Sequence, residues 1–295
     1  MKWGIVFAST GFPTPDAARN MVQAAEAAGF ESLWAPEHVV SSVTPGSAPY
    51  ASDDGSMERL WRRGGIPDPI VWLTYAAALT STIHLGTNVV ILPEHHPTAF
   101  AKKVATLDLL SGGRVLLGIG VGALPEEYEA VGMEFTNRGK RMDEYIEAMR
   151  ELWEHEVSTF HGRYVHFEQV RSDPSPVNGT IPLHIGGASP AAVRRAARYG
   201  QGFFPWVDPR RGVDVLHETL GQVIPGVRAE AEKLGRDPRS IEMTVGGART
   251  VAEAEVMAKL GVDRCTIAIR SKEPEAVRDE LGRFGDEVIA QTRDL

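Results

Sequence analysis

The chain alternates between short apolar runs and longer segments whose apolar residues recur at helical spacing. The short runs have the near-continuous apolar character of parallel strands that are covered on both faces. We expect these strands at residues 3–8, 32–36, 84–92, 114–120, 182–187, 202–206, 241–245 and 264–269. A helical pattern follows each run. The first opens with a capping residue and Pro at Thr14-Pro15 and stops at Gly29, which are typical helix boundaries.

Eight strand-then-helix units are typical of a single closed (β/α)8 barrel, the TIM barrel. The alternative is an open, doubly wound sheet in two domains, but the chain shows no linker that would divide it. We therefore expect residues 1–295 to form one α/β barrel domain. Two insertions interrupt the rhythm: a loop from Val39 to Pro69 after the second strand, and a hairpin with a Pro-rich crossing from Val157 to Thr180 before the fifth. A loop as long as the first is usually functional, and we expect it to cover the barrel mouth.

Composition and charge narrow the class of protein. The hydrophobic content of 43% is that of an ordinary globular protein, and the net charge of -8 without a basic block disfavours nucleic acids and anionic membranes as partners. No apolar run is long enough to span a bilayer, and the first residues lack a signal-peptide core, so we expect a cytoplasmic protein. The single Cys265 lies in an apolar run, which predicts a buried, inert thiol.

In a barrel of this kind the active site lies at the carboxyl ends of the strands, so the residues after each apolar run are the candidates. Glu37 and His38 follow the second run. Imidazole ionises near neutral pH, which suits proton transfer, although a histidine satisfied by a nearby carbonyl is the alternative. His95 and His96 follow the third run between two prolines and are predicted to lie in a loop. We expect no metal site there, because a metal would need further ligands.

Glycines mark the end of the fourth run, at Gly118, Gly120 and Gly122. They would let a planar ligand or a phosphate approach the backbone, or they could simply provide packing space. Their spacing lacks the third glycine of a dinucleotide fingerprint at the right offset. We expect the next residues, Glu126 to Tyr128, to cap a helix turn.

The fifth run ends in a Gly pair, and a helix begins at Ala188-Ser189-Pro190. The free N–H groups and the positive dipole of a helix start favour an anion such as phosphate. A plain Ser cap followed by Pro at the first helical position explains the same residues. Both interpretations stay open at this point.

Taken together, these segments resemble the luciferase-like monooxygenase superfamily, which are (β/α)8 enzymes that use flavins or deazaflavins. The similarity covers nearly the whole chain, and the pattern looks most like the branch that uses the deazaflavin coenzyme F420. It is carried by residues 29–40, 85–122, 126–135, 138–153, 160–177 and 181–205.

The resemblance implies an oxidoreductase that transfers a hydride between coenzyme F420 and a small organic substrate. An FMN-dependent monooxygenase that uses O₂ is the alternative, and a non-catalytic carrier or sensor of the same fold is a third hypothesis. The resemblance also implies a homodimer.

The roles of individual residues follow from the same resemblance. Asn88 and Val89 match a non-proline cis peptide that bulges against the isoalloxazine ring, and His38, with Glu37, matches a polar pair near the reactive edge of that ring. The remaining matches are the residues beside the ring and ribityl chain, Gly120, Val121 and Gly122, and those that receive the cofactor phosphate, Gly186, Gly187, Ala188 and Ser189.

Two positions depart from the family pattern. Some F420-dependent sugar-phosphate dehydrogenases have a catalytic Glu directly after the glycines of the fourth strand, where this chain has Ala123. Sugar-phosphate oxidation by that mechanism is therefore not implied. Gln201 replaces an Asp that family members often carry after the phosphate helix, which we expect to change local hydrogen bonding.

Overall fold

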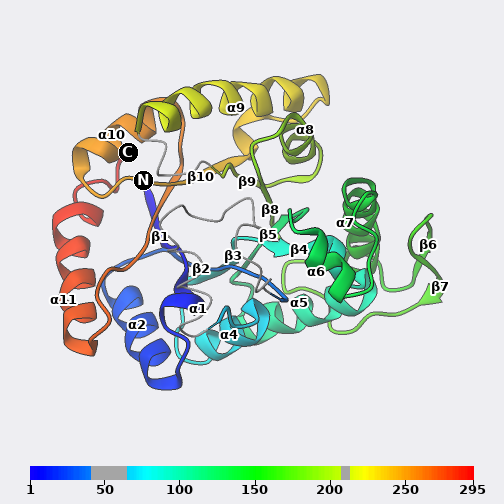
Figure 1. Cartoon of the computed structure of the whole chain (residues 1–295), viewed down its shortest axis with the longest axis horizontal. Helices are drawn as coiled ribbons and strands as arrows, with labels where there is room; N and C mark the ends of the chain where they lie inside the picture. Colours follow the sequence, from blue (N-terminus) through cyan, green and yellow to red (C-terminus); the bar gives the residue numbers. More distant parts are fainter. Residues whose placement is uncertain (41–64, 207–212) are drawn as a thin grey trace.

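The computed structural model describes residues 1–40, 65–206 and 213–295. Among them, eight parallel strands close into a barrel, because β3, the first strand in the order of the sheet, also pairs with β5 near its other end. This arrangement confirms the predicted (β/α)8 barrel (Figure 1). The strands are β1 (Lys2–Ile5), β2 (Ser32–Ala35), β3 (His84–Thr87), β5 (Val115–Gly120), β8 (Leu183–Gly186), β9 (Gly202–Phe204), β10 (Glu242–Gly246) and β11 (Arg264–Ile267).

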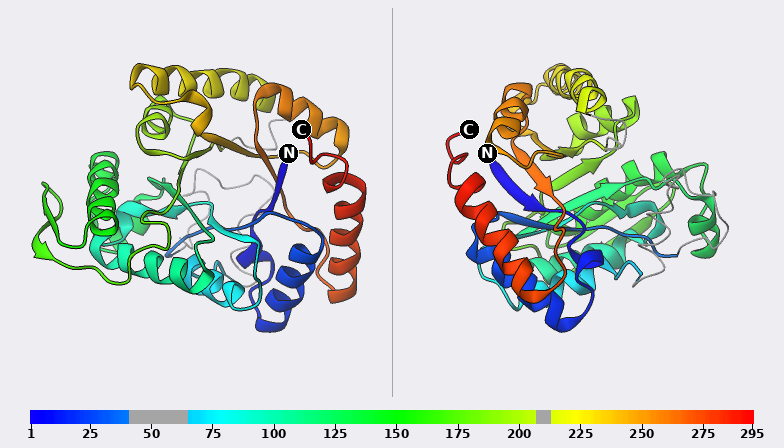
Figure 2. Two further views of the ribbon diagram at one scale, coloured as in Figure 1. Left: turned by 180° about the vertical axis from the view of Figure 1, so that it is seen from behind. Right: turned by 60° about the vertical axis from the view of Figure 1, so that its left-hand side comes forward.

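Helices surround the strands as an outer ring, which the views in Figures 1 and 2 show from several sides. The long helices are α2 (Pro15–Ala27), α4 (Pro69–Ala77), α5 (Pro97–Ser111), α7 (Arg138–Glu154), α8 (Pro190–Tyr199), α9 (Val213–Lys233), α10 (Val251–Leu260) and α11 (Pro274–Phe284). The short elements are α1 (Ala8–Gly11), α6 (Pro125–Ala130), the 3-10 turns η1 (Leu92–Glu94) and η3 (Pro238–Ser240), and the π-helical turn η4 (Gly285–Ile289). The two ends of the chain meet, because the amino group of Met1 donates to the carbonyl of Thr292.

Several strands are shorter than the apolar pattern predicts, among them the first and the third. The first ends at Ile5, because Phe7 has the left-handed φ of 57° and the chain turns into α1. The third is broken after Thr87. A cis peptide bond joins Asn88 to Val89, at the position that the resemblance implied, and the short strand β4 (Val90–Ile91) follows.

Large side chains fill the barrel interior opposite glycines. Trp34 is fully buried, and a Cβ atom on Gly86 would lie 2.4 Å from its indole ring, while one on Gly4 would lie 2.7 Å from its Nε1. Gly202 in the same way makes room for the imidazole of His184. Burial lowers the pKa of His184 to about 3, so this interior imidazole is neutral.

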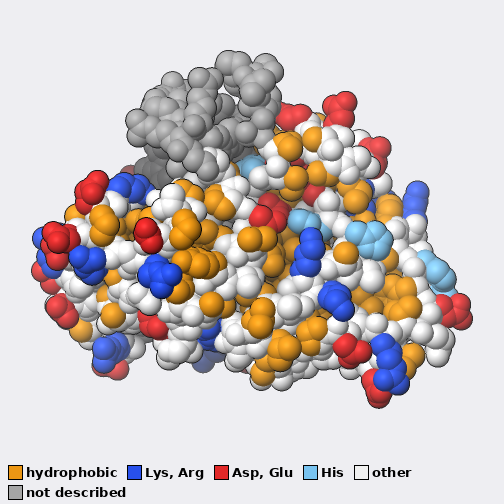
Figure 3. Space-filling view, turned by 90° about the horizontal axis from the view of Figure 1, so that it is seen from below, with side chains coloured by type: hydrophobic (Ala, Val, Ile, Leu, Met, Phe, Trp, Pro, Cys, Tyr) orange, Lys and Arg blue, Asp and Glu red, His pale blue; other side chains and the backbone are white. Residues whose placement is uncertain are grey.

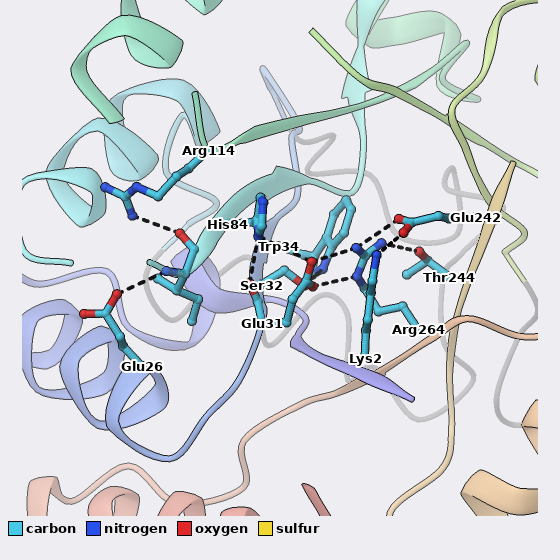
Figure 4. A network of polar contacts seen from close by, with 11 residues as sticks. Lys2, Glu26, Glu31, Ser32, Trp34, His84, Arg114, Glu242, Thr244 and Arg264 are labelled. Atoms are coloured by element: carbon cyan, nitrogen blue, oxygen red, sulfur yellow. Dashed lines mark hydrogen bonds and ion pairs between the residues drawn. The ribbon is translucent and has the colours of Figure 1, made fainter. Parts of the chain in front are cut away.

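A polar network closes the end of the barrel where the strands begin (Figure 4). The guanidinium of Arg264, only 1% exposed, donates to both carboxylate oxygens of Glu31 at 2.8 and 2.9 Å and to Thr244 Oγ1 at 3.0 Å. It also pairs with Glu242 at 3.1 Å. Burial opposes ionisation of Glu31, yet the hydrogen bonds from Arg264 hold the pKa of Glu31 below its ordinary value. The network therefore binds the first residues of three strands together.

Outside the barrel, β6 (Ser158–His161) and β7 (His166–Val170) form the antiparallel hairpin predicted before the fifth barrel strand (Figure 1). The other insertion, from Val39 to Pro69, falls mostly on residues 41–64, which lie outside the described residues. Residues 207–212 also lie outside the described residues.

The burial of Cys265, the hydropathy of the helices and the charges on the surface bear on the expectations drawn from composition. Cys265 is buried, and burial raises its pKa to about 12, which confirms an inert thiol. None of the helices in the described part of the chain combines the length and the hydropathy needed to cross a bilayer. Lys and Arg are interspersed with Asp and Glu over the described part of the face that Figure 3 shows.

The Arg264 network predicts a large stability effect. Arg264→Ala leaves the half-buried carboxylate of Glu31 without its partner, and we expect the free energy of unfolding to fall by about 3–5 kcal/mol in urea denaturation. Arg239→Ala, at an exposed position, is the control and should change it by about 0.5 kcal/mol or less. A loss below about 1 kcal/mol for Arg264→Ala would contradict the structural role of the network.

Candidate active site

A cavity of about 470 Å³ opens at the carboxyl ends of β1, β9, β10 and β11. Its walls are mainly apolar. Phe204 lines the cavity and also packs edge-on against Trp34 inside the barrel, with 5.5 Å between the ring centroids. Arg249 also lines the cavity, but its guanidinium is engaged by Glu280 at 3.0 Å and by the carbonyl of Ala268 at 2.9 Å. The cavity therefore suits a largely apolar molecule.

Two acceptors in this cavity are unpartnered. Asn88 Oδ1 and Thr266 Oγ1 are both buried, and neither makes a hydrogen bond to any of the described residues. Native proteins rarely leave such atoms unsatisfied, so each of the two requires a partner, such as a ligand or an ordered water molecule. The cavity thus offers hydrogen-bond positions to a ligand that carries N–H or O–H groups.

Val89 lies in a slot between two strands that carry glycine. A Cβ atom on Gly120 would lie 2.6 Å from one methyl of Val89, and a Cβ atom on Gly186 would lie 2.7 Å from the other. Gly118 is restricted even more, because its Cβ atom would lie 1.7 Å from the carbonyl oxygen of Thr87. Packing space, one of the two interpretations open from the sequence, is therefore a function of these glycines. Their contact with a cofactor stays a prediction.

Gly122 is restricted by β4, and Val121 is held by α6. Gly122 has a positive φ of 62°, and a Cβ atom on it would lie 2.7 Å from Ile91. The hydroxyl of Tyr128 donates to the carbonyl of Val121 at 2.7 Å. These contacts fix the backbone that leaves the end of β5.

The start of α8 shows the predicted cap. Ser189 is exposed, and its Oγ accepts a hydrogen bond from the backbone N–H of Ala192 at 3.2 Å. Gly186, Gly187 and Ala188 lead into it, half-buried, and Gly187 has a positive φ of 107°. The plain Ser cap is therefore present, and the positive end of the helix dipole is available beside it. None of these four residues lines the cavity described above.

His38 is paired with a residue that the sequence analysis assigned to another role. Its Nδ1 lies 2.9 Å from Oε2 of Glu127, which is fully buried in α6. The interpretation of residues 126–128 as helix caps is wrong for Glu127, because no side chain caps α6. One proton joins the pair, carried either by Nδ1 or by the carboxyl group.

Glu37 has a different partner from its neighbour His38. Its carboxylate is buried, lies 3.0 Å from Nε2 of His95 and accepts the backbone N–H of Ile91 at 2.7 Å. Glu37 therefore anchors the segment after β4. His95, predicted as an ordinary loop residue, completes this second pair.

A third buried carboxyl group lies in η1. Glu94 is 6% exposed, and neither of its oxygens has a hydrogen-bond partner among the described residues. Burial and then the charges of Glu127 and Glu37 raise its pKa to about 8, so Glu94 is protonated at neutral pH. The guanidinium of Arg141, also buried, acts in the opposite direction.

One local signal could have identified Glu127. It lies three residues after the buried Leu124, so the two residues lie on the same, inner side of the turn that begins α6. A carboxylate on such a face needs a partner. Glu94 carried no comparable signal. Within the described residues, no group of three or more His, Cys, Asp or Glu is placed to hold a metal ion.

Comparisons with known proteins agree with this architecture. Residues 3–290 match the family described as luciferase-like monooxygenase. An uncharacterised protein of Mycobacterium tuberculosis is 36% identical over 219 residues, which span 73% of this chain and 74% of that protein. An F420-dependent glucose-6-phosphate dehydrogenase of Kineococcus radiotolerans is 30% identical over 251 residues, which span 83% of this chain and 66% of that protein.

Among solved structures, the monooxygenase RslO1 from Streptomyces bottropensis superimposes with a TM-score of 0.76 and 21% identity. The match covers 99% of both chains. At this identity the likeness concerns the fold.

The slot of Val89 predicts a specific coupling between two substitutions. Gly120→Ala places a methyl group against Val89 and should lower the free energy of unfolding by about 1–3 kcal/mol. In a Val89→Ala background the same substitution should cost at least about 0.5 kcal/mol less, as a double-mutant cycle in urea would measure. Gly282→Ala, in a helix with nothing near its Cβ position, is the control and should not destabilise. If Gly120→Ala destabilises the wild type and the Val89→Ala variant equally, Val89 does not pack against Gly120 as described.

Glu94 predicts a pH dependence of stability. Its pKa is about 8 in the folded protein and near 4.5 when unfolded, so folding binds an extra proton between these values and stability falls as the pH rises through this window. Glu94→Gln removes this component. In chemical denaturation, the free energy of unfolding of the variant, relative to that of the wild type, should rise by up to about 1.4 kcal/mol per pH unit between pH 5 and pH 8. Glu129→Gln, at an exposed position of α6, is the control, and its free energy of unfolding should depend on pH as that of the wild type does. The same pH dependence for Glu94→Gln as for the wild type would contradict a protonated Glu94.

Proposed function

Because the chain belongs to the luciferase-like monooxygenase family, we propose that it is an oxidoreductase that transfers a hydride between coenzyme F420 and a small organic substrate. The observation that carries this proposal is the bulge at Asn88 and Val89, which sets a buried, unpartnered acceptor into an apolar cavity. The F420-dependent relative from Kineococcus radiotolerans supports F420 over FMN.

The residues at the barrel mouth are proposed to hold a phosphorylated tricyclic ring. Asn88 Oδ1 offers an acceptor to a ring N–H, and the neighbouring Val89 would present its apolar side chain to the ring. The end of β5, at Gly120, Val121 and Gly122, would border the ring and its ribityl chain. The start of α8, at Gly186, Gly187, Ala188 and Ser189, would receive the phosphate, since the helix dipole favours an anion there. Bound in this berth, the coenzyme would supply a two-electron acceptor and donor of hydride.

His38 is the residue proposed to move the proton that accompanies the hydride. Glu127 holds its Nδ1, which fixes the orientation of the imidazole ring. Glu37 acts indirectly in this proposal, because its hydrogen bonds to Ile91 and His95 fix the segment that follows Val89.

The substrate is proposed to be a small, uncharged organic molecule. The described walls of the cavity are mainly apolar, and Arg249 already has two partners. Ala123 stands where some F420-dependent sugar-phosphate dehydrogenases have a catalytic Glu. These features favour a substrate other than a sugar phosphate.

An FMN-dependent monooxygenase is the second candidate, and the similarity to the monooxygenase RslO1 favours it. The same berth would serve either cofactor, so binding decides between them. The homodimer and the cytoplasmic location expected from the sequence are retained as part of the proposal.

Titration of the purified protein with F420 and, separately, with FMN tests the assignment, followed by cofactor fluorescence. We expect F420 to bind, and Ser189→Asp to weaken its binding by about 10- to 100-fold, because Asp still caps α8 but repels the phosphate. Thr250→Asp, at the N-cap of α10, is the matched control and should leave the affinity unchanged. Tight binding of FMN without binding of F420 would favour the monooxygenase over the F420-dependent oxidoreductase. If Ser189→Asp binds F420 as tightly as the wild type does, the phosphate does not bind at the start of α8.

A further inference from the structure

The proposed cofactor contacts use only a small part of the cavity at the carboxyl ends of β1, β9, β10 and β11. Of the described residues that line the cavity, those contacts use only Asn88. The wall also includes Leu216 of α9 and Met257 of α10, so the cavity reaches the two helices that follow β9 and β10. Its volume of about 470 Å³ is roughly three times the ~150 Å³ of an engineered cavity that holds benzene. The cavity therefore has room for a second molecule beside the edge of a cofactor ring.

The cavity has a buried apolar floor and an exposed apolar rim. Val245 and Met257 are among the buried residues that line it. Three other large apolar side chains of the lining are much more exposed, with Phe7 at 38%, Val213 at 58% and Val256 at 40%. A single exposed apolar residue is common on a soluble protein, but these three come from separate segments and border one cavity. Apolar exposure that is gathered in this way is typical of a ligand-binding site.

The charged side chains that line the cavity already have partners within the protein. Arg249 is paired with Glu280 and donates to the carbonyl of Ala268. The carboxylate of Glu253 accepts the backbone N–H groups of Arg249 and Thr250 at 2.8 and 2.9 Å, and the first of these bonds is the main reason why the pKa of Glu253 lies below its ordinary value. A charged ligand would compete with these bonds, so the cavity favours an uncharged one.

A buried hydroxyl group supplies the cavity with a polar position. Thr266 of β11 lines the cavity and is only 2% exposed, and its Oγ1 has no hydrogen-bond partner among the described residues. The neighbouring strand carries Gly246 at the paired position, and a Cβ atom on it would lie 3.5 Å from this oxygen, so no side chain of residue 246 covers the hydroxyl. A buried hydroxyl without a partner costs free energy. Because a hydroxyl donates as well as accepts, a carbonyl oxygen is a suitable partner.

We propose that this cavity binds the substrate, and that the substrate is an uncharged, mainly apolar molecule whose carbonyl oxygen accepts a hydrogen bond from Thr266 Oγ1. The apolar part of the molecule packs against Met257 on the floor and extends to Val256 at the rim. The proposal rests on the proposed function, since it takes the bound molecule to be the substrate of that reaction. Thr266 determines which molecule binds, and it transfers no proton in this scheme.

Calorimetric titration with acetophenone and with ethylbenzene tests the role of Thr266 without any cofactor. The two molecules are similar in shape, but only acetophenone has a carbonyl oxygen. Thr266→Val removes the hydroxyl with little change in shape, and we expect the dissociation constant of acetophenone, divided by that of ethylbenzene, to rise by about 3- to 10-fold. Thr266→Ser keeps the hydroxyl and should leave this ratio unchanged. Thr266→Ala serves as a second variant without the hydroxyl, in case Thr266→Val does not fold.

Thr10→Val is the matched control for this titration. Thr10 is also buried, with a hydroxyl that has no partner among the described residues, but it does not line the cavity, so the ratio should stay as in the wild type. An unchanged ratio in the Thr266 variants without the hydroxyl would overturn the proposal, and so would a wild type that does not bind acetophenone. His217 of α9 also lines the cavity. A ratio that rises in His217→Leu but not in Thr266→Val would place the oxygen at α9, which contradicts the proposal.

A longer ketone tests the apolar rim. Butyrophenone carries a longer apolar chain than acetophenone and should bind the wild type about 5-fold more tightly or better. Val256→Asp places a charge at the rim and should remove most of this gain, while the affinity for acetophenone changes little. Val71→Asp, at an exposed position of α4 that does not line the cavity, is the control. Equal affinity of the wild type for the two ketones would show that the chain does not reach the rim, against the proposal.

Titration with F420 separates this proposal from the function on which it rests. Thr266→Val should bind F420 as tightly as the wild type does, because the proposed cofactor contacts do not include Thr266. A loss of F420 affinity in Thr266→Val would assign Thr266 to the cofactor and overturn the proposal. If the wild type does not bind F420 while Thr266→Val changes the ratio as expected, the F420-dependent function is refuted and the carbonyl-binding site stands.

Discussion

The packing of Val89 against two glycines is the constraint on which the site depends. Its methyl groups occupy positions that a Cβ atom at residue 120 or residue 186 would enter, so β5 and β8 must both carry glycine there. With Val89 held in this slot, the strand that began as β3 is interrupted and Asn88 lines the cavity. A single close contact between three strands thus shapes the berth proposed for the cofactor.

Buried polar groups have hydrogen-bond partners at one end of the barrel, whereas some of them lack partners among the described residues at the other end. Where the strands begin, Arg264 is paired with Glu31 and Glu242, which is a fully partnered network of the kind that stabilises a fold. Where the strands end, Asn88 and Glu94 retain unpartnered atoms among the described residues. Proteins accept such violations mainly at functional sites, so this contrast supports the proposal that the chemistry takes place where the strands end.

Periodicity was sufficient to predict the eight strands and the external hairpin, because burial on both faces leaves a local apolar signature. The family resemblance located the bulge at Asn88 and Val89. The pairings of the site were not predictable in this way. Glu127 contacts His38 across 89 residues and His95 contacts Glu37 across 58, so neither pair leaves a pattern in a local window. Glu94 follows Pro and precedes His, where a charged residue looks like an ordinary exposed turn.

The most direct measurement is a crystal structure of the protein with F420 bound. The account predicts that the deazaflavin ring contacts the side chain of Val89, that a ring N–H donates to Asn88 Oδ1, and that the phosphate lies at the start of α8. It also predicts that Val89 stays between Gly120 and Gly186. A ring bound away from Val89, or a Val89 side chain that leaves the slot when the cofactor binds, would contradict it.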